Sequence, residues 1–203
     1  MIFNETVLKK LMKAAHRSSG LLAGNRDGEI ILAGPWWAVG MDEEYISNKT
    51  KAALVELIGM LPEQGDLYRC KNDVNQFEVP GAVAAWLIEA RTADYSQALK
   101  KTDVLVDRTT EGMIRLYQSK EETIAVREVI VDLLDGTPGE DEDPYIQGPC
   151  RRSGDSSVLF WRTRECTLVA LRYEMIEKDH EASGTYTDTE KLYQKLQKLD
   201  LIS

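Results

Sequence analysis

The sequence predicts an α+β protein in which mostly antiparallel strands are combined with short helices. Two apolar runs, residues 158–161 and 168–171, flank the segment Arg-Thr-Arg-Glu and predict two strands joined by a short charged turn. The Asp-Gly pair inside residues 25–28 predicts a second hairpin, because this pair suits the positive φ angles of tight turns. Apolar residues at helical spacing in residues 4–17 and 189–199 predict a helix near each end. We therefore expect one α+β domain over residues 1–203.

The other elements follow from periodicity and from the residues that end them. Helices are indicated where apolar residues recur every three or four positions, and strands where they alternate or form short runs. Gly59 and Pro62 mark the end of the second helix, since glycine readily adopts the left-handed conformation there. The predicted helices cover residues 4–17, 50–58, 82–91 and 189–199; strands are predicted on both sides of 25–28 and at 37–41, 67–70, 76–79, 103–106, 113–118, 123–126, 158–161 and 168–171; residues 127–134 fit either state, and residues 136–144 are a polar loop.

Two segments of the chain share an order of residue types. ALVELIGMLP at residues 53–62 and VIVDLLDGTP at residues 129–138 both run apolar, acidic, apolar, Gly, Pro. One interpretation is a duplicated strand–strand–helix unit, with repeat halves at residues 20–80 and 100–176. The other is independent occurrence, because apolar helices often end in Gly followed by Pro.

Composition narrows the classes of protein. The chain has 203 residues, 43% of them hydrophobic, which is enough for a core of useful size. The net charge of -9 gives no global attraction to phosphate backbones, although it leaves room for a local basic patch. The three cysteines form no CxxC pair, and no apolar run reaches the roughly 18 residues of a membrane span. We expect a cytoplasmic protein with reduced thiols and no membrane partner.

No motif for a known catalytic chemistry is found in the sequence. The patterns GxSxG, GxxxxGK[ST] and GxGxxG are missing, and the only two histidines, His16 and His180, are expected at the surface. Cys166 lies in a predicted core strand, where a thiol is inert. The acidic residues 140–143 lack the register of a calcium loop and are interpreted as solvated. We therefore predict no cofactor and no metal site, and a protein that is not an enzyme is favoured.

Basic residues gather in two places along the chain. If both groups share one face, an acidic protein could still hold a nucleic-acid backbone there. The alternative is ordinary surface charge that neighbouring acids neutralise. The first group is Lys9, Lys10, Lys13 and Arg17, and the second is Arg151, Arg152, Arg162, Arg164 and Arg172.

Two apolar features are candidates for contact with a partner. In a strand, the adjacent Trp36 and Trp37 would point to opposite faces, and an outward tryptophan could anchor another protein. The alternative is that both pack within the molecule. The leucine stripe of residues 189–199 could dock on its own core or on another chain. That stripe consists of Leu192, Leu196 and Leu199.

The order of elements resembles that of sliding clamps, in which short helices line one side of antiparallel sheets built from repeated units. The helix ends LIGMLP and LLDGTP and the late strands VLFW and TLVALRY carry this resemblance, which covers about half of the chain. The chain is short for a complete clamp subunit, and the final helix falls outside the pattern. Its acidic composition without a catalytic signature also resembles uncharacterised proteins of bacteriophages and mobile elements.

Three functions remain open from the sequence. The leading one is a non-catalytic binding or assembly protein, clamp-like in DNA metabolism, that contacts nucleic acid through the basic groups and has a protein partner or forms a homo-oligomer. The second is a metal-dependent nuclease or other hydrolase with dispersed carboxylates such as Glu174 and Glu177. The third is an acidic inhibitor that mimics nucleic acid through residues 140–143.

Overall fold

The computed structural model describes residues 3–72, 74–77, 87, 90, 99–108, 111–120, 122–134, 147–152, 155–163, 165–176 and 178–202. Within these residues it contains an eight-stranded sheet, a three-stranded sheet and five short α-helices. Every neighbouring pair of strands is antiparallel, which confirms the predicted α+β class.

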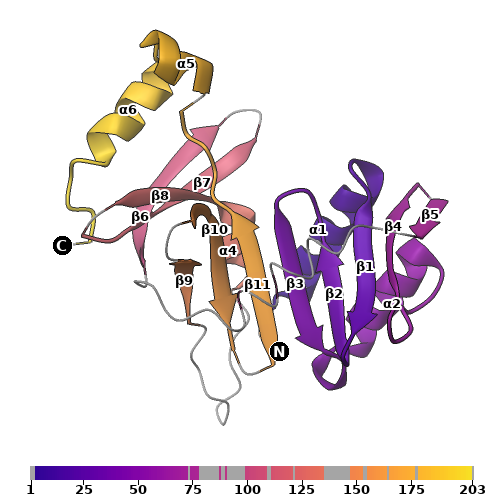
Figure 1. The fold of residues 1–203 in the computed structure, drawn as a ribbon. Coiled ribbons are helices and arrows are strands. Elements are labelled where there is room, and N and C mark those ends of the chain that lie inside the picture. The colour runs from indigo at the N-terminus through magenta and orange to yellow at the C-terminus, as the bar shows by residue number, and fades with distance from the viewer. Residues whose placement is uncertain are drawn as a thin grey trace.

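Figure 1 shows the elements in chain order, in which strands outnumber helices. The helices are α1 (Glu5–Arg17), η1 (Glu43–Tyr45, a 3-10 helix), α2 (Asn48–Ile58), α4 (Glu128–Leu133), α5 (Lys178–Ser183) and α6 (Asp188–Leu196). The strands are β1 (Leu21–Arg26), β2 (Glu29–Ala33), β3 (Trp37–Asp42), β4 (Leu67–Lys71), β5 (Val74–Phe77), β6 (Lys100–Arg108), β7 (Gly112–Gln118), β8 (Thr123–Arg127), β9 (Gln147–Arg152), β10 (Asp155–Arg162) and β11 (Cys166–Leu171).

The large sheet has the strand order β5-β4-β1-β2-β3-β11-β10-β9. Its β1–β2 hairpin turns at Asp27 and Gly28, with φ angles of 55° and 81°, so the predicted tight hairpin is confirmed. The late hairpin β10–β11 is confirmed as well, and β11 brings it against β3. The two strand groups of the large sheet therefore come from opposite ends of the chain.

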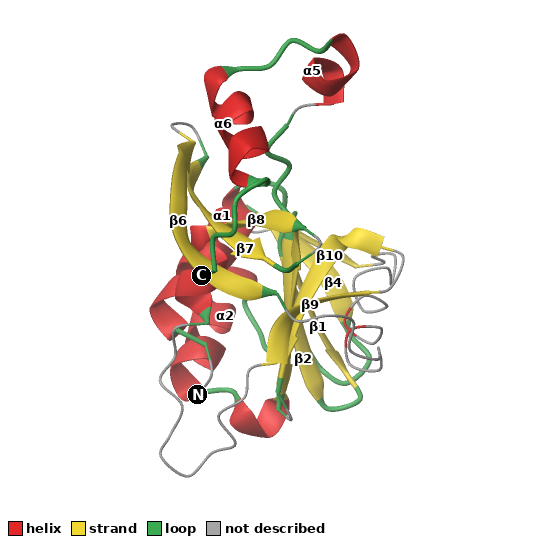
Figure 2. Ribbon diagram, turned by 90° about the vertical axis from the view of Figure 1, so that its left-hand side faces the viewer, coloured by secondary structure: helices red, strands yellow, loops and turns green. Residues whose placement is uncertain are grey.

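Both faces of the large sheet are covered, as the apolar runs of its strands require. On one face, residues such as Leu32, Val39 and Leu168 form a core with α1, α2 and α4. Figure 2 shows α1 and α2 side by side on that face of the strands. The alternate residues, such as Ile31 and Phe160, belong to a second cluster on the other face, together with Leu87 and Ala90. These two residues are the described part of the predicted helix 82–91, and both are helical.

The small sheet, in the order β6-β7-β8, lies between the main core and α6. Tyr117 and Ile124 face the main core, whereas Ile114 and Leu116 face a cluster that contains Tyr193 of α6. The Tyr193 hydroxyl donates to the backbone oxygen of Thr123 over 2.9 Å. Further bonds hold the segment that follows α6: the Gln118 side chain donates to the oxygen of Leu199 over 2.6 Å and accepts from the nitrogen of Leu201 over 2.7 Å.

Of the predicted leucine stripe of the C-terminal helix, Leu196 packs against the cluster of the small sheet. Leu192 is 49% exposed and Leu199 is 55% exposed, whereas Tyr193 is buried. A capping box sets this orientation, since the Glu190 carboxylate accepts hydrogen bonds from the backbone nitrogen and hydroxyl of Thr187. Tyr193 lies three residues after Glu190 on the same face, so it points inward and most of the leucine stripe points outward.

Other differences concern elements with weak local signals. Residues 127–134, which fitted either state, form the end of β8 and the helix α4. The strand β9 and the short helix α5 were not predicted. Pro149 lies in β9, which is an edge strand of the large sheet. Proline has no backbone N–H, and an edge strand tolerates it because one side of the strand needs no donor to a neighbouring strand. β5 begins at Val74, two residues before the predicted strand, while residues 78–79 and the loop 136–144 lie outside the described residues.

Candidate functional site

A groove of about 550 Å³ runs between α1 and α2 and is lined by charged side chains of both helices. Its floor includes Met12 and Ala53, which are buried in the main core. Four lysines and two glutamates surround this floor: Lys9, Lys10, Lys13, Lys49, Glu5 and Glu56.

Helix geometry explains why the lysines gather at this groove. Asn4 caps α1, because its side-chain oxygen accepts from the backbone nitrogens of Thr6 and Val7 over 3.1 and 3.3 Å. The buried stripe of α1, which includes Leu8 and Leu11, then faces the sheet and leaves the lysines on the outer side. Ser47 caps α2, so Lys49 lies in its first turn and reaches the same groove.

Glu56 of α2 holds two of these lysines. Lys9 Nζ lies 2.9 Å from one carboxylate oxygen, and Lys13 Nζ lies 3.0 Å from the other. The hydrogen bond from Lys9, followed by that from Lys13, lowers the pKa of Glu56 below its ordinary value. Lys49 lies 3.8 Å from Glu5 and is 87% exposed. The first basic group is thus gathered by the fold and partly neutralised by its own acids.

Of the second basic group, Arg162 lies away from the first. Arg162 shares the sheet face of Phe160, and it donates to the backbone oxygen of Ala90 over 3.2 Å. That face is opposite to the one that α1 covers. Arg172 lies 3.2 Å from Glu174, an acid of its own segment. Arg151 and Arg152 lie on β9 with side chains outside the described part, and Arg164 lies outside the described residues altogether. Arg17 is exposed in the last turn of α1.

A second cleft, of about 520 Å³, lies where β8 passes into α4, with Trp36 and the β6–β7 turn as further walls. Here the Arg127 guanidinium stacks on two aromatic rings, 4.6 Å from the centre of Trp36 and 4.8 Å from that of Tyr173. Glu111 lies 3.8 Å from Arg127. Burial lowers the pKa of Arg127, so the rings and Glu111 compensate for lost hydration. This cation joins segments that lie far apart in the chain.

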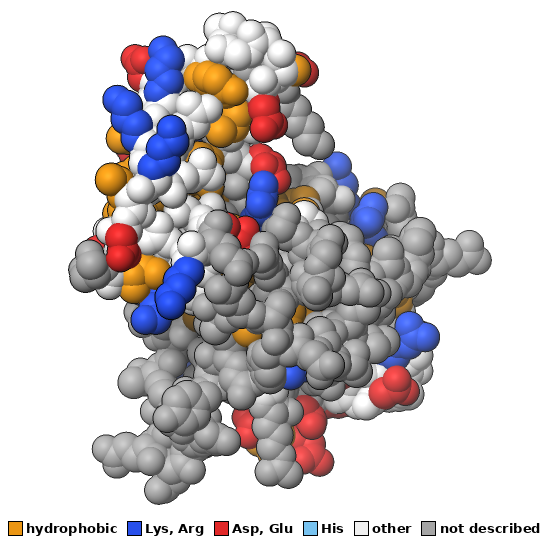
Figure 3. All heavy atoms as spheres, turned by 60° about the vertical axis from the view of Figure 1, so that its left-hand side comes forward, with side chains coloured by type: hydrophobic (Ala, Val, Ile, Leu, Met, Phe, Trp, Pro, Cys, Tyr) orange, Lys and Arg blue, Asp and Glu red, His pale blue; other side chains and the backbone are white. Residues whose placement is uncertain are grey.

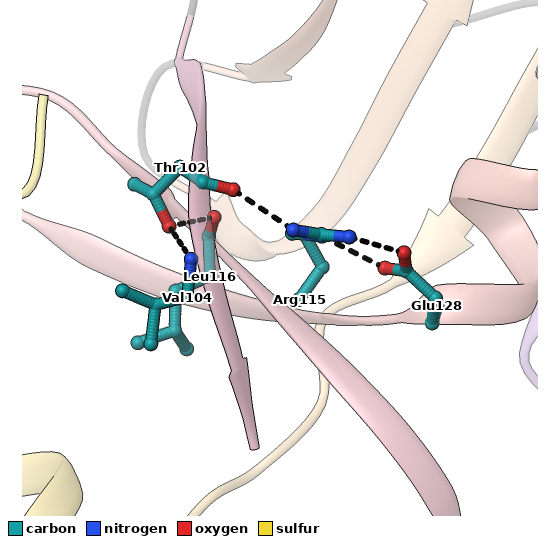
Figure 4. A network of polar contacts seen from close by, with 5 residues as sticks. All are labelled: Thr102, Val104, Arg115, Leu116 and Glu128. Atoms are coloured by element: carbon teal, nitrogen blue, oxygen red, sulfur yellow. Dashed lines mark hydrogen bonds and ion pairs between the residues drawn. The ribbon is translucent and has the colours of Figure 1, made fainter.

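Below this cleft, a partly buried ion pair fixes α4 to the small sheet (Figure 4). The Arg115 Nε atom donates to Glu128 over 2.9 Å, and its Nη2 atom donates to the other carboxylate oxygen. Arg115 also donates to the backbone oxygen of Thr102 over 3.2 Å. The Thr102 hydroxyl in turn donates to the oxygen of Leu116 over 2.8 Å. The network connects β6, β7 and α4 and has a scaffold role.

The two tryptophans have different environments. Trp37 is 3% exposed within the main core, whereas Trp36 is partly buried and packs against both that core and Arg127. Trp36 borders the second cleft, from which a partner could reach it. The surface position predicted for His16 was wrong, because its side chain is 8% exposed in the last turn of α1. The burial predicted for Cys166 is confirmed, at 6% exposure.

The described residues include no group of three His, Cys, Asp or Glu side chains that could hold a metal ion. Glu174 pairs with Arg172, and Glu177 lies outside the described residues, as do the acids 140–143. None of the described helices is long and apolar enough to span a membrane.

Comparison of the chain with protein-family models, with curated proteins and with solved structures found no match. The assignment of the candidate site therefore rests on the structure alone. The helical spacing of Lys9, Lys10 and Lys13 indicated them as a group. Nothing in the sequence indicated Lys49, because Lys49 joins them only through the packing of α2 beside α1. Nor did the sequence indicate Arg127, which carries no local signal of its stacked position.

Proposed function

We propose that this chain is a non-catalytic binding protein with a clamp-like role in DNA metabolism, and that the α1–α2 groove contacts the phosphate backbone. The observation that carries the proposal is the convergence of four lysines from two helices on one open groove. Lysines held on rigid helices can replace the counterions of phosphates without reading the sequence of bases.

The charge balance of the groove suits a weak and salt-dependent contact. Glu56 already neutralises part of Lys9 and Lys13, so a phosphate must compete with it for these two ammonium groups. Lys10 and Lys49 are exposed and lie nearer to a ligand from solvent. The net charge of -9 repels DNA at long range, which confines attraction to this face.

A similar order of elements in two parts of the chain supports the clamp-like part of the proposal. In the first half, β1, β2 and β3 pair in sequence, α2 follows, and the hairpin β4–β5 pairs with β1 through β4. In the second half, β6, β7 and β8 pair in sequence, α4 follows, and β9–β10 forms the next hairpin. The nitrogen of Leu99, just before β6, donates to the oxygen of Pro149 in β9 over 3.0 Å, which is the counterpart of the β1–β4 contact.

The two helices of this comparison also lie on the same core. Leu54 of α2 and Ile130 of α4 occupy matching positions of the segments 53–62 and 129–138, and each is 1% exposed in the main core. Repeated strand groups that place their helices on one face are the arrangement that the resemblance to sliding clamps implies. We propose the repeat halves 20–80 and 100–176 on this basis.

The test is DNA binding measured by fluorescence anisotropy with a labelled duplex at about 50 mM salt, where phosphate contacts are strongest. We expect the double substitution Lys10→Gln and Lys49→Gln to weaken binding and to reduce the slope of log K against log salt by about 2. Glu56→Gln should strengthen binding, because it frees Lys9 and Lys13 from their carboxylate.

The matched control removes the same charge from another surface, through Lys100→Gln and Lys101→Gln on β6, where both side chains are exposed. It should leave affinity nearly unchanged. Absence of binding by the unaltered protein at low salt, or an equal loss in the control, would overturn the assignment of the groove.

A further inference from the structure

The outward side of α6 and the residues after it combine basic and apolar groups. Three lysines follow one another at spacings of four and three residues, so they line one side of the helix. Leu192 and Leu199 lie beside them and are about half exposed, at 49% and 55%. Figure 3 shows this mixture of basic and hydrophobic side chains on the upper left of the molecule. We call this the α6 face, and its residues are Lys191, Leu192, Lys195, Lys198 and Leu199.

The α6 face is held in place by the fold. The inner side of α6 is fixed by Tyr193, which is buried and bonded to Thr123, and by the capping box at Glu190. The exposed leucines are therefore not needed to attach α6 to its own sheet. Asp188 lies 3.6 Å from Lys191 and offsets part of the basic charge. Exposed apolar residues with a polar rim suit a contact with protein, since phosphate backbones offer leucine no apolar surface.

A surface of opposite charge lies on the first half of the chain, where the β1–β2 turn, η1 and the segment after α2 meet. The nitrogen of Glu43 donates to the oxygen of Gly28 over 2.9 Å, and the nitrogen of Gly28 donates to the Gln64 side chain over 3.3 Å. The side chain of Asn25 donates to Glu43 over 3.2 Å and so binds η1 to the end of β1. We call this the η1 face, and its exposed acids and apolar residues are Asp27, Glu43, Glu44, Tyr45, Leu61 and Glu63.

The η1 face has the composition that the α6 face needs in a partner. Tyr45 is 52% exposed and Leu61 is 40% exposed, and the same segments carry four exposed acids. Arg26 lies beside Asp27 in the chain, and Lys51 of α2 borders the same cleft as Glu43 and Leu61. These two cations against four acids leave the surface acidic. Opposite charges steer the two faces together, and the exposed apolar residues supply the area that is removed from water.

We propose that the α6 face of one molecule docks on the η1 face of a second copy of this chain. The two faces are different surfaces, so the contact is heterologous, and a pair of copies keeps one free η1 face and one free α6 face. Association therefore extends beyond a dimer, as a closed assembly or as an open series. The net charge of -9 makes two copies repel at long range, so the attraction between them is confined to these two faces of opposite charge.

The test measures mass by sedimentation velocity over a range of protein concentrations, without nucleic acid, so that it is independent of the proposed DNA contact. The unaltered protein should show concentration-dependent species larger than a dimer, and added salt should weaken them. Variant A carries Leu192→Ser and Lys195→Gln on the α6 face. Variant B carries Glu44→Gln and Tyr45→Ser on the η1 face. Each alone should lose association by about tenfold or more.

Mixing the two variants gives the decisive result. Variant A keeps a functional η1 face and variant B a functional α6 face, so an equal mixture should form a dimer and stop there. Lys100→Gln with Lys101→Gln, which removes charge elsewhere, should associate like the unaltered protein. A monomer at every concentration, association untouched by variant B, or binding of α6 to anionic vesicles that variant A abolishes would each overturn the proposal.

Discussion

The helices α2, in the first half of the chain, and α4, in the second half, each follow three antiparallel strands, but they place their charged side chains in opposite environments. α2 of the first half presents Glu56 to solvent, where this residue and Lys9 are 53% and 44% exposed. α4 of the second half places Glu128 against Arg115, with 18% and 12% exposure. A helix after three antiparallel strands can therefore either leave its charges open to ligands or use them to close a junction.

This difference follows from what packs against each helix. α2 lies beside α1, whose lysines leave an open groove, whereas α4 lies against β7, β8 and the first turn of α1. The nitrogen of Asn4, just before α1, donates to the oxygen of Leu133 over 2.8 Å, so the end of α4 is fixed to the start of the chain. At the other end of α4, Arg127 stacks on Trp36, just before β3, and on Tyr173, after β11. In the second half, α4 therefore fixes distant segments to one another, whereas α2 in the first half borders an open groove.

The largest expected effect comes from the matched core positions of the two helices. Leu54→Ala and Ile130→Ala should each lower the free energy of unfolding by about 3 kcal/mol, because each leaves a cavity in the main core. Urea denaturation followed by tryptophan fluorescence and far-UV circular dichroism measures this loss. Since both residues belong to one core, each variant should shift a single shared transition.

This experiment also tests the expectation of one domain over residues 1–203. If the halves unfold separately, each substitution will shift only one of two transitions, and the prediction of a shared core will be contradicted. A suitable control is Val55→Ala on the outer side of α2, where the side chain is 43% exposed and little cavity forms.

The ion pair of the second half gives the next largest effect. Arg115→Met should cost about 3 kcal/mol of unfolding free energy, because it leaves the Glu128 carboxylate partly buried without its cation. Adding Glu128→Leu to this variant should restore part of the loss, since the unpaired charge is then removed. Arg172→Met, at the exposed pair with Glu174, should cost less than about 1 kcal/mol. If Arg115→Met and Arg172→Met lower the free energy of unfolding equally, the expected difference between the partly buried and the exposed ion pair is contradicted.

The sequence predicted those elements whose signals are local. The β1–β2 turn was found through Asp27 and Gly28, and the end of α2 through Gly59, which has a φ angle of 84°. Both depend on a few neighbouring residues that favour positive φ. The late hairpin was found because its apolar runs are long enough for a strand covered on both sides.

Features that depend on distant packing were not predictable in this way. The strand β9 exists because β10 pairs with it, and His16 is buried because the last turn of α1 lies against the sheet. In α6, Tyr193 and Leu196 meet the cluster of the small sheet while Leu192 is exposed, and periodicity alone fits an inward leucine stripe equally well. For the candidate site, the sequence predicted the cluster of lysines on α1. The fold was needed to show that Lys49 joins this cluster and that Arg162 lies away from it.

The smallest expected effect concerns the open charges of the first half, and it can be followed through Glu56. Hydrogen bonds from Lys9 and Lys13 lower the pKa of this carboxyl from its ordinary value of 4.5. A lowered pKa means that the charged form stabilises the folded state above pH 4.5, and that this contribution is lost as pH falls through the lowered value. In Glu56→Gln this part of the pH dependence should vanish.

A carboxyl-detected NMR titration measures the pKa of Glu56 directly. Salt should return it toward 4.5, because the pair is exposed and therefore screened. A DNA duplex should also raise it, since phosphates would draw the lysines away and add negative charge beside the carboxyl. A pKa that responds to salt and not to DNA would show that the open charges of α2 serve only its own contact with α1.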